Sequence, residues 1–581
     1  MKRFLVFILA LVFMFPGAAL AQQDSYTASS DGMGGPVEVT VTFEGGKIAS
    51  VTIGANNETP GVSDKALTDI PAQIVQYQSV ALDAVSGATL SSNAIINAVK
   101  ACIELAGLNV DDFSAPVAAV TSDAQVEMTA DVVVIGAGGA GLAAAITAQE
   151  KGAQVIVLEK MSSAGGNTIL SGGLYNCVDP TRQQRSGVED SVEKHIQQTL
   201  EGGDNVANPE LVQILCENAT DGLLWLESMG MMFDEDVTTA TGALWPRSHQ
   251  AVLPNGTGFI QTYLKALEGT DVQILYQVRA DQILMEDGRA VGVHAVGDDG
   301  TDYTFTANKG VILASGGYGS NVEMRQQYNT QWPTLDESVT SSNSIGATGD
   351  GIIMAQAIGA NLVGMDYIQL HPLGNPETGN FAGALRGDVE SYIQVNLEGE
   401  RYVAEDARRD VLCSAALEQT DGLMWQVTDS NSASNSTPEN AVSLGYAVKG
   451  DTLEELAQAM GVDPAAFVAT IEQYNTAVDT GVDELGRTIL TKKIEVAPFY
   501  AALRSVTVHH TMGGVEINAQ AQVIDTNGQV IPCLYAAGEV TGGIHGSNRL
   551  GGNALADTVV FGRIAGSSAA AFVLAEQDLA A

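Results

Sequence analysis

The sequence of 581 residues is long enough for three or more domains and strongly acidic, with 69 Asp and Glu residues, 27 Lys and Arg residues and a net charge of −42. This charge argues against nucleic acid and anionic lipid surfaces as partners. It would also repel anionic substrates, so a carboxylate site must gather cations locally, and each of the seven histidines is a candidate.

The first 21 residues have the pattern of a secretory signal peptide. Lys2 and Arg3 precede an apolar run at residues 4–15, and Ala19-Leu20-Ala21 resembles a cleavage site. The run is too short to cross a bilayer, and no second long apolar stretch follows. We therefore expect an exported, soluble protein, in the periplasm if the source is a Gram-negative bacterium.

The cysteines are odd in number and far apart in the chain: Cys102, Cys177, Cys216, Cys413 and Cys533. They form neither the C-x-x-C-H motif that attaches haem nor a cluster typical of metal ligands. We expect no haem, no metal, and buried thiols that act as small apolar groups.

Residues 22–107 are expected to form a small α+β domain. Alternating apolar residues at 37–43 and 47–53 flank a Glu-Gly-Gly turn, which predicts a hairpin. A helical run that ends at Leu105 follows later, and Ser91 or Ser92 is its expected N-cap. Residues 108–126 are rich in Ser, Ala, Pro and Asp and are expected to be a linker.

A dinucleotide-binding unit follows the linker. An apolar strand at 132–135 leads into G-x-G-x-x-G at Gly136, Gly138 and Gly141 and then into an Ala-rich helix. In this pattern the first glycine makes the turn, the second lets the backbone approach a pyrophosphate, and the third permits close helix–strand packing. The helix N-terminus favours an anion.

A second apolar strand, at 155–158, ends on Glu159, whose carboxylate is expected to accept hydrogen bonds from ribose hydroxyls. The glycine-rich stretches 165–168 and 171–173 could approach a flavin ring. Residues 363–503 differ in sequence character from the segments on either side and are expected to be an inserted domain. Further elements are expected as helices within 189–233 and at 350–359, and as strands near 272–276, 281–285, 290–295 and 311–314.

The stretch Asp83-Ala-Val-Ser86-Gly87-Ala88-Thr89 resembles the motif of the FMN-binding domain family, D-x-x-S/T-G-A-T. In that family a separate flavin transferase attaches FMN to the last threonine through a phosphoester. The resemblance therefore implies covalent FMN on Thr89. Glu58-Thr-Pro-Gly61 is also similar to that family.

Residues 127–570 resemble the flavoprotein subunits of the fumarate reductase and succinate dehydrogenase family. The layout is similar to the soluble periplasmic fumarate reductases related to flavocytochrome c, which include urocanate reductase relatives. The resemblance rests on Gly165-Gly-Asn-Thr168, Gln369-Leu-His371-Pro372, Arg409-Asp410, His509-His-Thr-Met-Gly-Gly514 and Gly542-Gly-Ile-His-Gly-Ser-Asn-Arg549-Leu-Gly-Gly-Asn553.

This resemblance implies an α/β protein with a Rossmann-like FAD-binding domain at 127–362 and 504–581. An α+β capping domain is inserted at 363–503, and the small α+β FMN-binding domain precedes both. FAD is expected to be non-covalent. The residues expected to bind it are Gly136, Gly138, Gly141, Glu159, Lys160, Gly166, Asn167, Thr168, Gly173, Asp350, Glu539, Asn553 and Leu555.

The same resemblance implies reduction of an activated C=C bond by hydride from N5 of reduced FAD. His509 and Arg549 are expected to clamp one carboxylate, since the planar guanidinium pairs with carboxylate in a bidentate way. His371 and Arg386 would hold the far end of the substrate, and Arg409 matches the family's proton donor. Without such a context a histidine is more often structural, and that is the expectation for His195, His249 and His294.

The chain departs from the family at two positions. Where the fumarate enzymes carry Thr-Glu-Ala-x-Arg, this chain has Ala382-Gly383-Ala384-Leu385-Arg386, so the relay glutamate is missing. Leu373 replaces a small polar residue. Both the proton supply and the far end of the pocket therefore differ from the family pattern.

The first hypothesis is an exported reductase of a fumarate-like enoate that serves anaerobic respiration. FMN would pass it electrons from a membrane-linked or soluble donor. Urocanate, methacrylate, acrylate or an aryl acrylate are alternative substrates. The same fold could also act as a dehydrogenase or oxidase, for example on a 3-ketosteroid or an amino acid. A third alternative is a non-enzymatic electron carrier that uses only the FMN domain.

Overall fold

In the computed structural model, the described residues are 23–32, 34–58, 63–82, 84–85, 88–117, 122–385, 388–431 and 438–572. They form two compact units, the first up to Ser122 together with Met161–Ser163, and the second from Asp123 onward without those three residues. The expected signal peptide lies outside the described residues. Among the helices of the described ranges, none has the length and apolar character needed to cross a bilayer.

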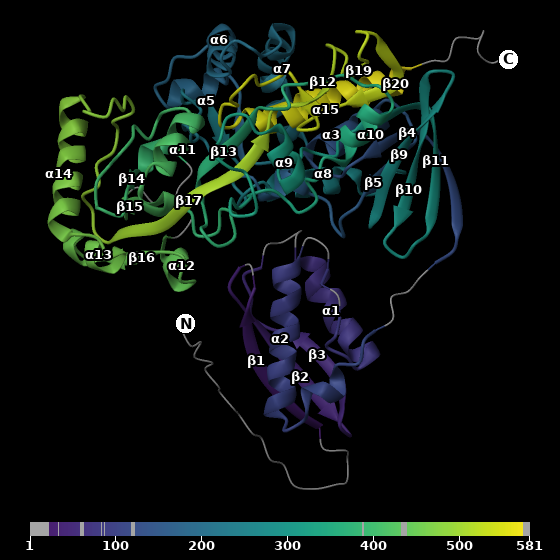
Figure 1. Ribbon diagram of the computed structural model, residues 1–581, viewed down its shortest axis with the longest axis horizontal. Coiled ribbons are helices and arrows are strands. Elements are labelled where there is room, and N and C mark those ends of the chain that lie inside the picture. Colours follow the sequence, from purple (N-terminus) through teal and green to yellow (C-terminus); the bar gives the residue numbers. More distant parts are fainter. Residues whose placement is uncertain are drawn as a thin grey trace. The chain divides into compact units, whose positions relative to one another are not determined.

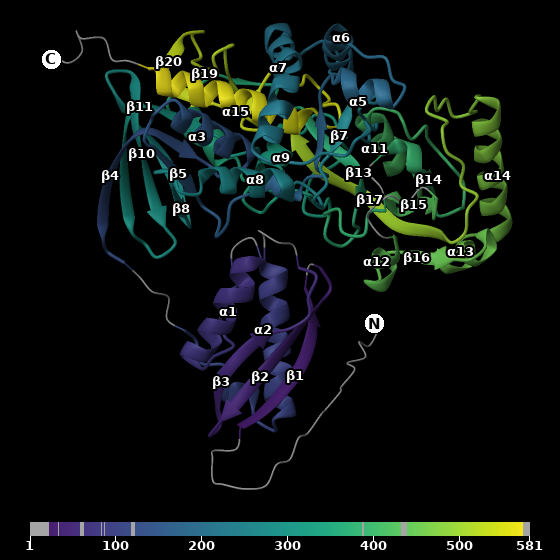
Figure 2. The same ribbon diagram turned by 180° about the vertical axis from the view of Figure 1, so that it is seen from behind.

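The first unit is an antiparallel three-stranded sheet with helices on one face (Figures 1 and 2). The predicted hairpin is confirmed, since β2 and β3 pair directly and Val37, Val39 and Val41 point into the core. Phe113 joins the same core, so packing in this unit continues past residue 107, where we expected the domain to end. Its elements are β1 (Gln23–Asp31), β2 (Pro36–Glu44), β3 (Lys47–Ile53), α1 (Asp64–Tyr77), α2 (Thr89–Leu105) and the 3₁₀ turn Val110–Phe113.

The predicted N-cap of α2 is wrong. The helix starts at Thr89 with Ala88 as its N-cap residue, so Ser91 and Ser92 lie inside its first turn. Ser92 Oγ donates back to the Ala88 carbonyl at 2.9 Å, while Ser91 Oγ bonds to Glu58. The hydroxyls therefore serve contacts other than a cap.

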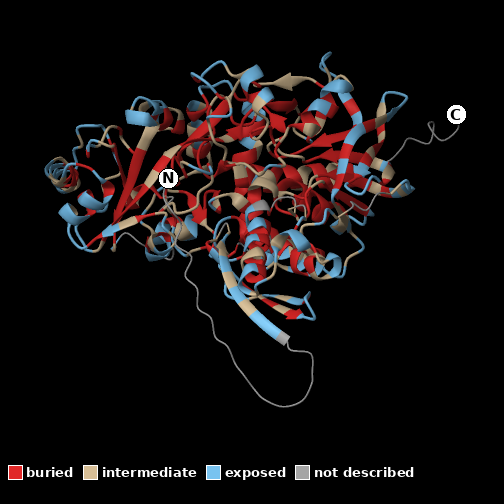
Figure 3. Ribbon diagram, turned by 60° about the horizontal axis from the view of Figure 1, so that its bottom comes forward, coloured by how far each residue is buried: buried red, intermediate tan, exposed pale blue. Residues whose placement is uncertain are grey.

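The second unit is built around an eight-stranded sheet whose central strands run parallel in the order β20-β11-β4-β5-β8. The predicted strand at 132–135 is the end of β4, which begins at Gln125 because residues 125–130 pair with β11. Strand β5 and the C-terminal ends of β4, β11 and β20 are buried, whereas β8 at the edge is only partly covered (Figure 3). The sheet strands are β4 (Gln125–Ile135), β5 (Val155–Glu159), β8 (Gln273–Tyr276), β9 (Val278–Glu286), β10 (Arg289–Gly297), β11 (Asp302–Leu313), β19 (Gln522–Ile524) and β20 (Val530–Ala536).

Helix α3 (Gly139–Glu150) packs closely against α15 (Asn553–Ala571), the long yellow helix of Figure 1. A Cβ at Gly566 would lie 2.2 Å from the Ala144 carbonyl oxygen, so small residues allow the helices to approach. The other elements of this domain are α4 (Gly166–Leu170), β6 (Leu174–Asn176), α5 (Pro180–Arg185), α6 (Val192–Gly202), α7 (Pro209–Ser228), β7 (Ser248–Gln250), α8 (Thr257–Leu267), α9 (Val322–Tyr328), α10 (Asp350–Ala357), β12 (Leu362–Val363), β18 (Gly514–Glu516) and β21 (Thr541–Gly542).

The inserted segment forms a second, five-stranded sheet, β13-β17-β15-β14 with β16 beside β17. The long strand β17 (Phe499–Thr511) leads from this sheet back into the rest of the second unit, so the expected boundary at 503/504 lies inside one strand (Figure 1). The remaining elements are β13 (Ile368–Gly374), β14 (Ile393–Val395), α11 (Arg409–Leu417), β15 (Leu423–Asp429), α12 (Pro438–Ser443), β16 (Val448–Gly450), α13 (Leu453–Met460), α14 (Pro464–Thr480) and the 3₁₀ turns Val389–Ser391 and Thr420–Gly422.

All five cysteines are free and buried, as expected. Among the described residues no group of His, Cys, Asp or Glu side chains could hold a metal ion.

Candidate active site

The glycine turn after β4 has the geometry that a dinucleotide needs. Gly136 has φ +107, and a Cβ there would lie 2.3 Å from the Ala314 carbonyl oxygen. A Cβ at Gly141 would lie 1.9 Å from the Gly136 carbonyl oxygen, so α3 can start this close to the turn only with glycine. Gly138 is the N-cap residue of α3 and supplies no side-chain cap, which leaves the positive end of the helix dipole for an anion.

Two side chains stabilise this turn. Glu159, at the end of β5, accepts a hydrogen bond from the Ala137 N–H at 2.8 Å, and Thr168 Oγ1 accepts one from the Gly139 N–H at 3.1 Å. Gly165 pairs with Gly138, and Gly166 begins α4. Glu159, Gly166 and Thr168 were all expected at the cofactor, and the structure brings them to one loop.

Lys160 and Asp350, also expected at the cofactor, contact each other. Lys160 Nζ lies 3.0 Å from Asp350 Oδ2 and donates to Thr348 Oγ1 at 2.6 Å. Arg279 Nε also donates to Asp350, at 3.1 Å. Asp350 is the first residue of α10.

Three further residues expected at the cofactor contact other protein groups. The side chain of Asn553 is fully buried and bonded to protein groups, namely Asn176, Thr199 and His195. Leu555 is buried in α15. A Cβ at Gly173 would lie 2.1 Å from the Asn255 carbonyl oxygen.

The predicted catalytic residues that the structure describes converge. Arg409 lies at the start of α11, where its Nε donates to the Thr241 carbonyl oxygen at 2.9 Å and its Nη1 to Gln369 Oε1 at 3.0 Å. Gln369 Nε2 in turn donates to the carbonyl oxygen of Arg549 at 2.8 Å. One amide therefore joins the two arginines, which are 140 positions apart in the sequence.

His371 and His509 face each other beside these arginines. Their ring centroids are 4.9 Å apart, and the Phe381 ring lies 4.8 Å from His371 and 5.3 Å from His509. The Leu373 N–H donates to His371 Nδ1 at 3.2 Å, so the proton of a neutral His371 sits on Nε2. His509 Nδ1 lies 2.8 Å from Ser342 Oγ. No sequence motif indicated Phe381 or Ser342.

The cluster is positively charged and poorly neutralised. Burial, followed by the charge of Arg549, holds the pKa of Arg409 well below its usual range, and burial lowers the pKa of Arg549 to about 10. Burial and the two arginines also depress the pKa values of His371, His509 and His510. Arg549 Nε and His510 Nε2 are buried without a hydrogen-bond partner. A buried cation without a partner is costly, and a bound anion would supply one.

Glu539 connects the cluster to the cofactor loop. It accepts hydrogen bonds from Asn167 Nδ2 at 2.9 Å and from the Thr511 N–H at 3.0 Å, and it lies 3.3 Å from His510 Nδ1. Burial raises its pKa. Glu539 therefore adjoins His510, and Asn167, also expected at the flavin, reaches this histidine only through Glu539.

The missing relay glutamate corresponds to a distinct local structure. Gly383 has φ +70, and a Cβ there would lie 2.2 Å from Tyr446 Cβ and 3.0 Å from Arg504 Nη2. A glutamate therefore does not fit on this backbone. Arg504, which the motifs did not reveal, is fully buried and donates to the Ala382 carbonyl oxygen at 2.8 Å. Arg386 lies outside the described residues.

The other histidines bond to protein groups. His195 contacts Asn553, His249 contacts the Tyr175 carbonyl, His294 lies between Asp281 and Asp302, and His545 faces Asp557. This agrees with a structural role for the first three.

In the first unit, Glu58 anchors the segment next to the expected FMN attachment site. Its carboxylate accepts from the Gly34 N–H at 2.8 Å, from Ser63 Oγ at 3.1 Å and from Ser91 Oγ. Ser91 is two residues after Thr89. The Thr89 side chain and residues 83, 86 and 87 lie outside the described part of the chain.

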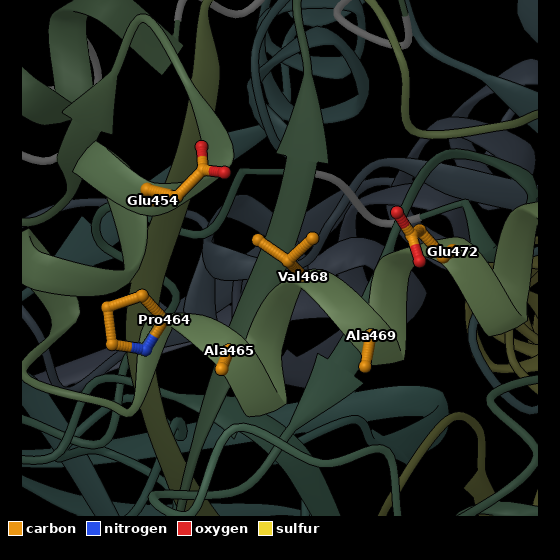
Figure 4. Close-up of a pocket in the computed structure, with 6 residues that line it drawn as sticks. All are labelled: Glu454, Pro464, Ala465, Val468, Ala469 and Glu472. Carbon is orange, nitrogen blue, oxygen red and sulfur yellow. The ribbon is translucent and has the colours of Figure 1, made fainter.

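A groove on α13 and α14 offers little chemistry by comparison. It is lined by Pro464, Ala465, Val468 and Ala469 with Glu454 and Glu472 at its sides (Figure 4). Its lining has no cation and no nucleophile, so an anionic substrate has no partner there.

The glycine turn, the open helix end and the unpartnered nitrogens of Arg549 and His510 fit a flavin-dependent oxidoreductase. The FAD binding domain family matches residues 131–555, and the FMN-binding domain family matches residues 32–104. The chain belongs to the flavocytochrome-type family of 2-enoate reductases, and its mixed α/β fold is that of their flavoproteins.

The relatives support this assignment. The chain is 38% identical to a urocanate reductase of Eggerthella lenta, over 96% of this chain and 93% of that protein. It is 38% identical to an NADH:acrylate oxidoreductase of Vibrio harveyi over 94% of this chain, and it spans 61% of the length of that relative. The open conformation of a flavocytochrome c3 fumarate reductase matches with a TM-score of 0.62 and 39% identity, over 76% of this chain and 78% of that one.

Proposed function

We propose that this protein is an exported flavoprotein that reduces the C=C bond of an α,β-unsaturated carboxylate, with a fumarate-like enoate as substrate, as a terminal reductase of anaerobic respiration. The observation that carries the proposal is the pair of buried arginines, Arg409 and Arg549, among three histidines beside the cofactor loop, where Arg549 Nε and His510 Nε2 have no hydrogen-bond partner. In a chain of net charge −42, such a concentration of cations is best explained by an anionic substrate.

The residues around the glycine turn fit FAD. The uncapped α3 terminus suits its pyrophosphate, Glu159 suits its ribose, and Glu539, which accepts from Asn167, adjoins the cluster at His510. When bound, FAD supplies the hydride that reduces the C=C bond. FMN on Thr89, installed by a flavin transferase, would deliver electrons from a membrane-linked or soluble donor.

Arg549 and His509 would bind the conjugated carboxylate. A guanidinium presents a planar pair of N–H donors to a carboxylate, and negative charge that develops on the substrate during reduction strengthens this contact. Because Arg549 is buried, solvent screens this interaction less than it would in bulk water, and the interaction is correspondingly stronger. His371 and Arg386 would hold the far end of the substrate.

Arg409 would donate the proton. An ordinary arginine is too weak an acid, with a pKa above about 12. Here burial and the adjacent Arg549 lower the pKa of Arg409, and its observed acceptors are the neutral oxygens of Thr241 and Gln369. Both effects make loss of a proton easier than it is for an arginine paired with a carboxylate.

The test is reoxidation of the reduced holoenzyme. Purified flavoprotein is reduced with viologen, and its reoxidation is followed with fumarate, urocanate, methacrylate, acrylate and cinnamate. Rapid reoxidation by at least one of them is expected, with fumarate favoured. Faster reoxidation by urocanate or acrylate would instead favour one of these as the substrate, as the names of the relatives suggest.

The rival functions give different results in the same experiment. A dehydrogenase or oxidase would consume oxygen with a saturated substrate and leave every enoate untouched. A pure electron carrier would contain no FAD, and no substrate would reoxidise it.

A further inference from the structure

Arg408, directly before the proposed proton donor, joins the capping domain to the FAD-binding domain. Its Nη1 and Nη2 donate to the two carboxylate oxygens of Asp204 at 2.6 and 3.0 Å. Its Nε and Nη2 also donate to Asp410, in the first turn of α11, at 3.0 and 2.9 Å. The Arg408 guanidinium is thus bonded to its own helix, α11, through Asp410 and to the FAD-binding domain through Asp204.

Asp204 is attached just as firmly to the segment that carries Arg549. Ser547 Oγ donates to the Asp204 carboxylate, and the Ser547 N–H donates to the Gly203 carbonyl at 3.2 Å. Asn548 Nδ2 donates to the Gly202 carbonyl at 3.1 Å. The turn after α6 and residues 545–548 therefore hold together as one block, and Arg549 follows directly.

The backbone of this turn is unusual. Asp204 and Asn205 both have φ +56, a left-handed conformation that few residues other than glycine adopt, although Asp and Asn tolerate it better than most. Hydrogen bonds from the Asp204 N–H to Glu201 at 3.0 Å and from the Asn205 N–H to Leu200 at 2.8 Å keep it in place. Such conformations persist where the surroundings enforce them, often at functional sites.

We propose that Asp204 is a positioning residue that latches the capping domain to the FAD-binding domain and sets the distance between Arg409 and Arg549. It does so by binding Arg408 and Ser547 at the same time. The two arginines repel each other, and within the site Gln369 joins them through neutral hydrogen bonds. The bidentate ion pair between Arg408 and Asp204 lies outside the site and opposes that repulsion by holding the two domains together.

The exposure of the pair suits a latch that opens and closes. The Asp204 side chain is 52% exposed and that of Arg408 is 22% exposed, so water can replace either partner when the domains separate. Exposed ion pairs contribute little to folding stability. Loss of this pair should therefore change catalysis much more than stability.

The experiment compares Asp204→Asn with Asp221→Asn in the holoenzyme. Asparagine also tolerates the left-handed backbone, so the first variant removes the charge with little change to the turn. The second removes the same charge from an exposed pair with Arg563, 2.7 Å apart, on the FAD-binding domain. Viologen-coupled kcat and KM are measured with the best enoate of the panel, together with FAD content and melting temperature.

Asp204→Asn should lower kcat/KM about tenfold to a hundredfold, mainly through kcat, because small displacements of catalytic groups have effects of that size. FAD content and melting temperature should match the unaltered enzyme, and Asp221→Asn should resemble it throughout. Arg408→Lys, which keeps the charge without the bidentate geometry, should give a smaller loss. The double variant Asp204→Asn/Arg408→Gln should be no slower than Arg408→Gln alone.

Kinetics of Asp204→Asn within about twofold of the unaltered enzyme, or equal losses in Asp221→Asn, would overturn the latch. The inference rests on the proposed function, so hydrogen–deuterium exchange provides a separate readout. Faster exchange at 545–549 and 409–417 in Asp204→Asn alone supports the latch, and unchanged exchange rejects it. An unaltered holoenzyme that reduces no enoate would instead reject the proposed function.

Discussion

Arg409 and Arg401 show how partners decide the acidity of a buried arginine. Arg401 is bonded to the carboxylates of Glu405 and Asp483, at 2.6 and 2.7 Å, and although burial opposes it these partners raise its pKa. Arg409 is more deeply buried, bonds to two neutral oxygens and lies near a second arginine, and its pKa is lowered. The same residue type is thus a stable ion-pair partner in one place and a candidate acid in the other.

Arg409→Ala should leave FAD bound and reduce kcat for the enoate by about 10²–10⁴-fold, the usual contribution of a general acid. Without Arg409 the carbanion-like transition state of the substrate has no proton donor, whereas the cofactor loop stays intact. Flavin absorbance and viologen-coupled turnover measure the two effects. Arg185→Ala, at an exposed ion pair with Glu235, is the control and should be fully active. Unchanged turnover in Arg409→Ala would remove this residue from the mechanism.

Thr89→Ala should abolish covalent FMN, because the phosphoester needs the hydroxyl. The protein is produced together with a flavin transferase and run on a denaturing gel, where only covalently bound flavin stays fluorescent. Thr68→Ala serves as the control, since Thr68 is an exposed threonine of α1 whose hydroxyl bonds to the Asp64 carbonyl. Fluorescence that survives in Thr89→Ala would place the linkage on another residue.

At the scale of elements, the contact between β4 and α3 makes a sharp prediction. Gly141→Ala puts a Cβ 1.9 Å from the Gly136 carbonyl oxygen, a backbone atom that cannot move aside easily. We expect a loss of unfolding free energy of about 1–3 kcal/mol or more, with reduced FAD content. Gly258→Ala, in the first turns of α8, meets its nearest atom at 3.5 Å and should be neutral or stabilising by up to about 1 kcal/mol. Chemical unfolding of both variants would test this, and equal stability would refute the packing argument.

Local sequence signals predicted the elements that depend on local chemistry. The glycine turn, its flanking strands, the first hairpin and the helices between 189 and 233 follow from patterns of a few residues, and they are found. The start of α2 was misplaced because Ser91 bonds to Glu58, 33 positions away, in place of a helix N–H. A long-range partner of this kind leaves no trace in local propensity.

The geometry of the histidines is likewise set by an irregular strand pair. Gln369 pairs with His510 and Leu370 with Val508, so His509 is left outside the ladder at a bulge. Bulges redirect side chains and are common near active sites. This bulge accompanies the approach of His509 to His371 and Phe381, which a motif can suggest only by family resemblance.

For the whole molecule, the distribution of charge matters more than its sum. The chain carries 42 more negative than positive side chains, yet one cluster of the second unit brings together two arginines and three histidines. Of these, His510 has a carboxylate neighbour in Glu539. The acidic exterior favours solubility, while the interior site offers the potential that an anion needs.

The buried histidines should also make the protein unstable in acid. Burial lowers the pKa of His195 to about 3 and depresses those of His371, His509 and His510. Below the ordinary histidine pKa of about 6.5 the unfolded chain binds protons that the folded protein does not, so stability falls as the pH falls. Each such histidine lowers the free energy of unfolding by about 1.4 kcal/mol per pH unit.

Urea unfolding at about pH 7 and about pH 5.5 measures this loss, and His195→Gln should reduce it by about 1.4 kcal/mol per pH unit. His294 is the control of opposite sign, because hydrogen bonding to Asp281 raises its pKa. Its stabilisation is present at low pH and disappears as the pH rises through the folded pKa, so His294→Gln should make the acid loss steeper. Identical pH slopes in the unaltered protein and both variants would show that these histidines do not control the acid sensitivity.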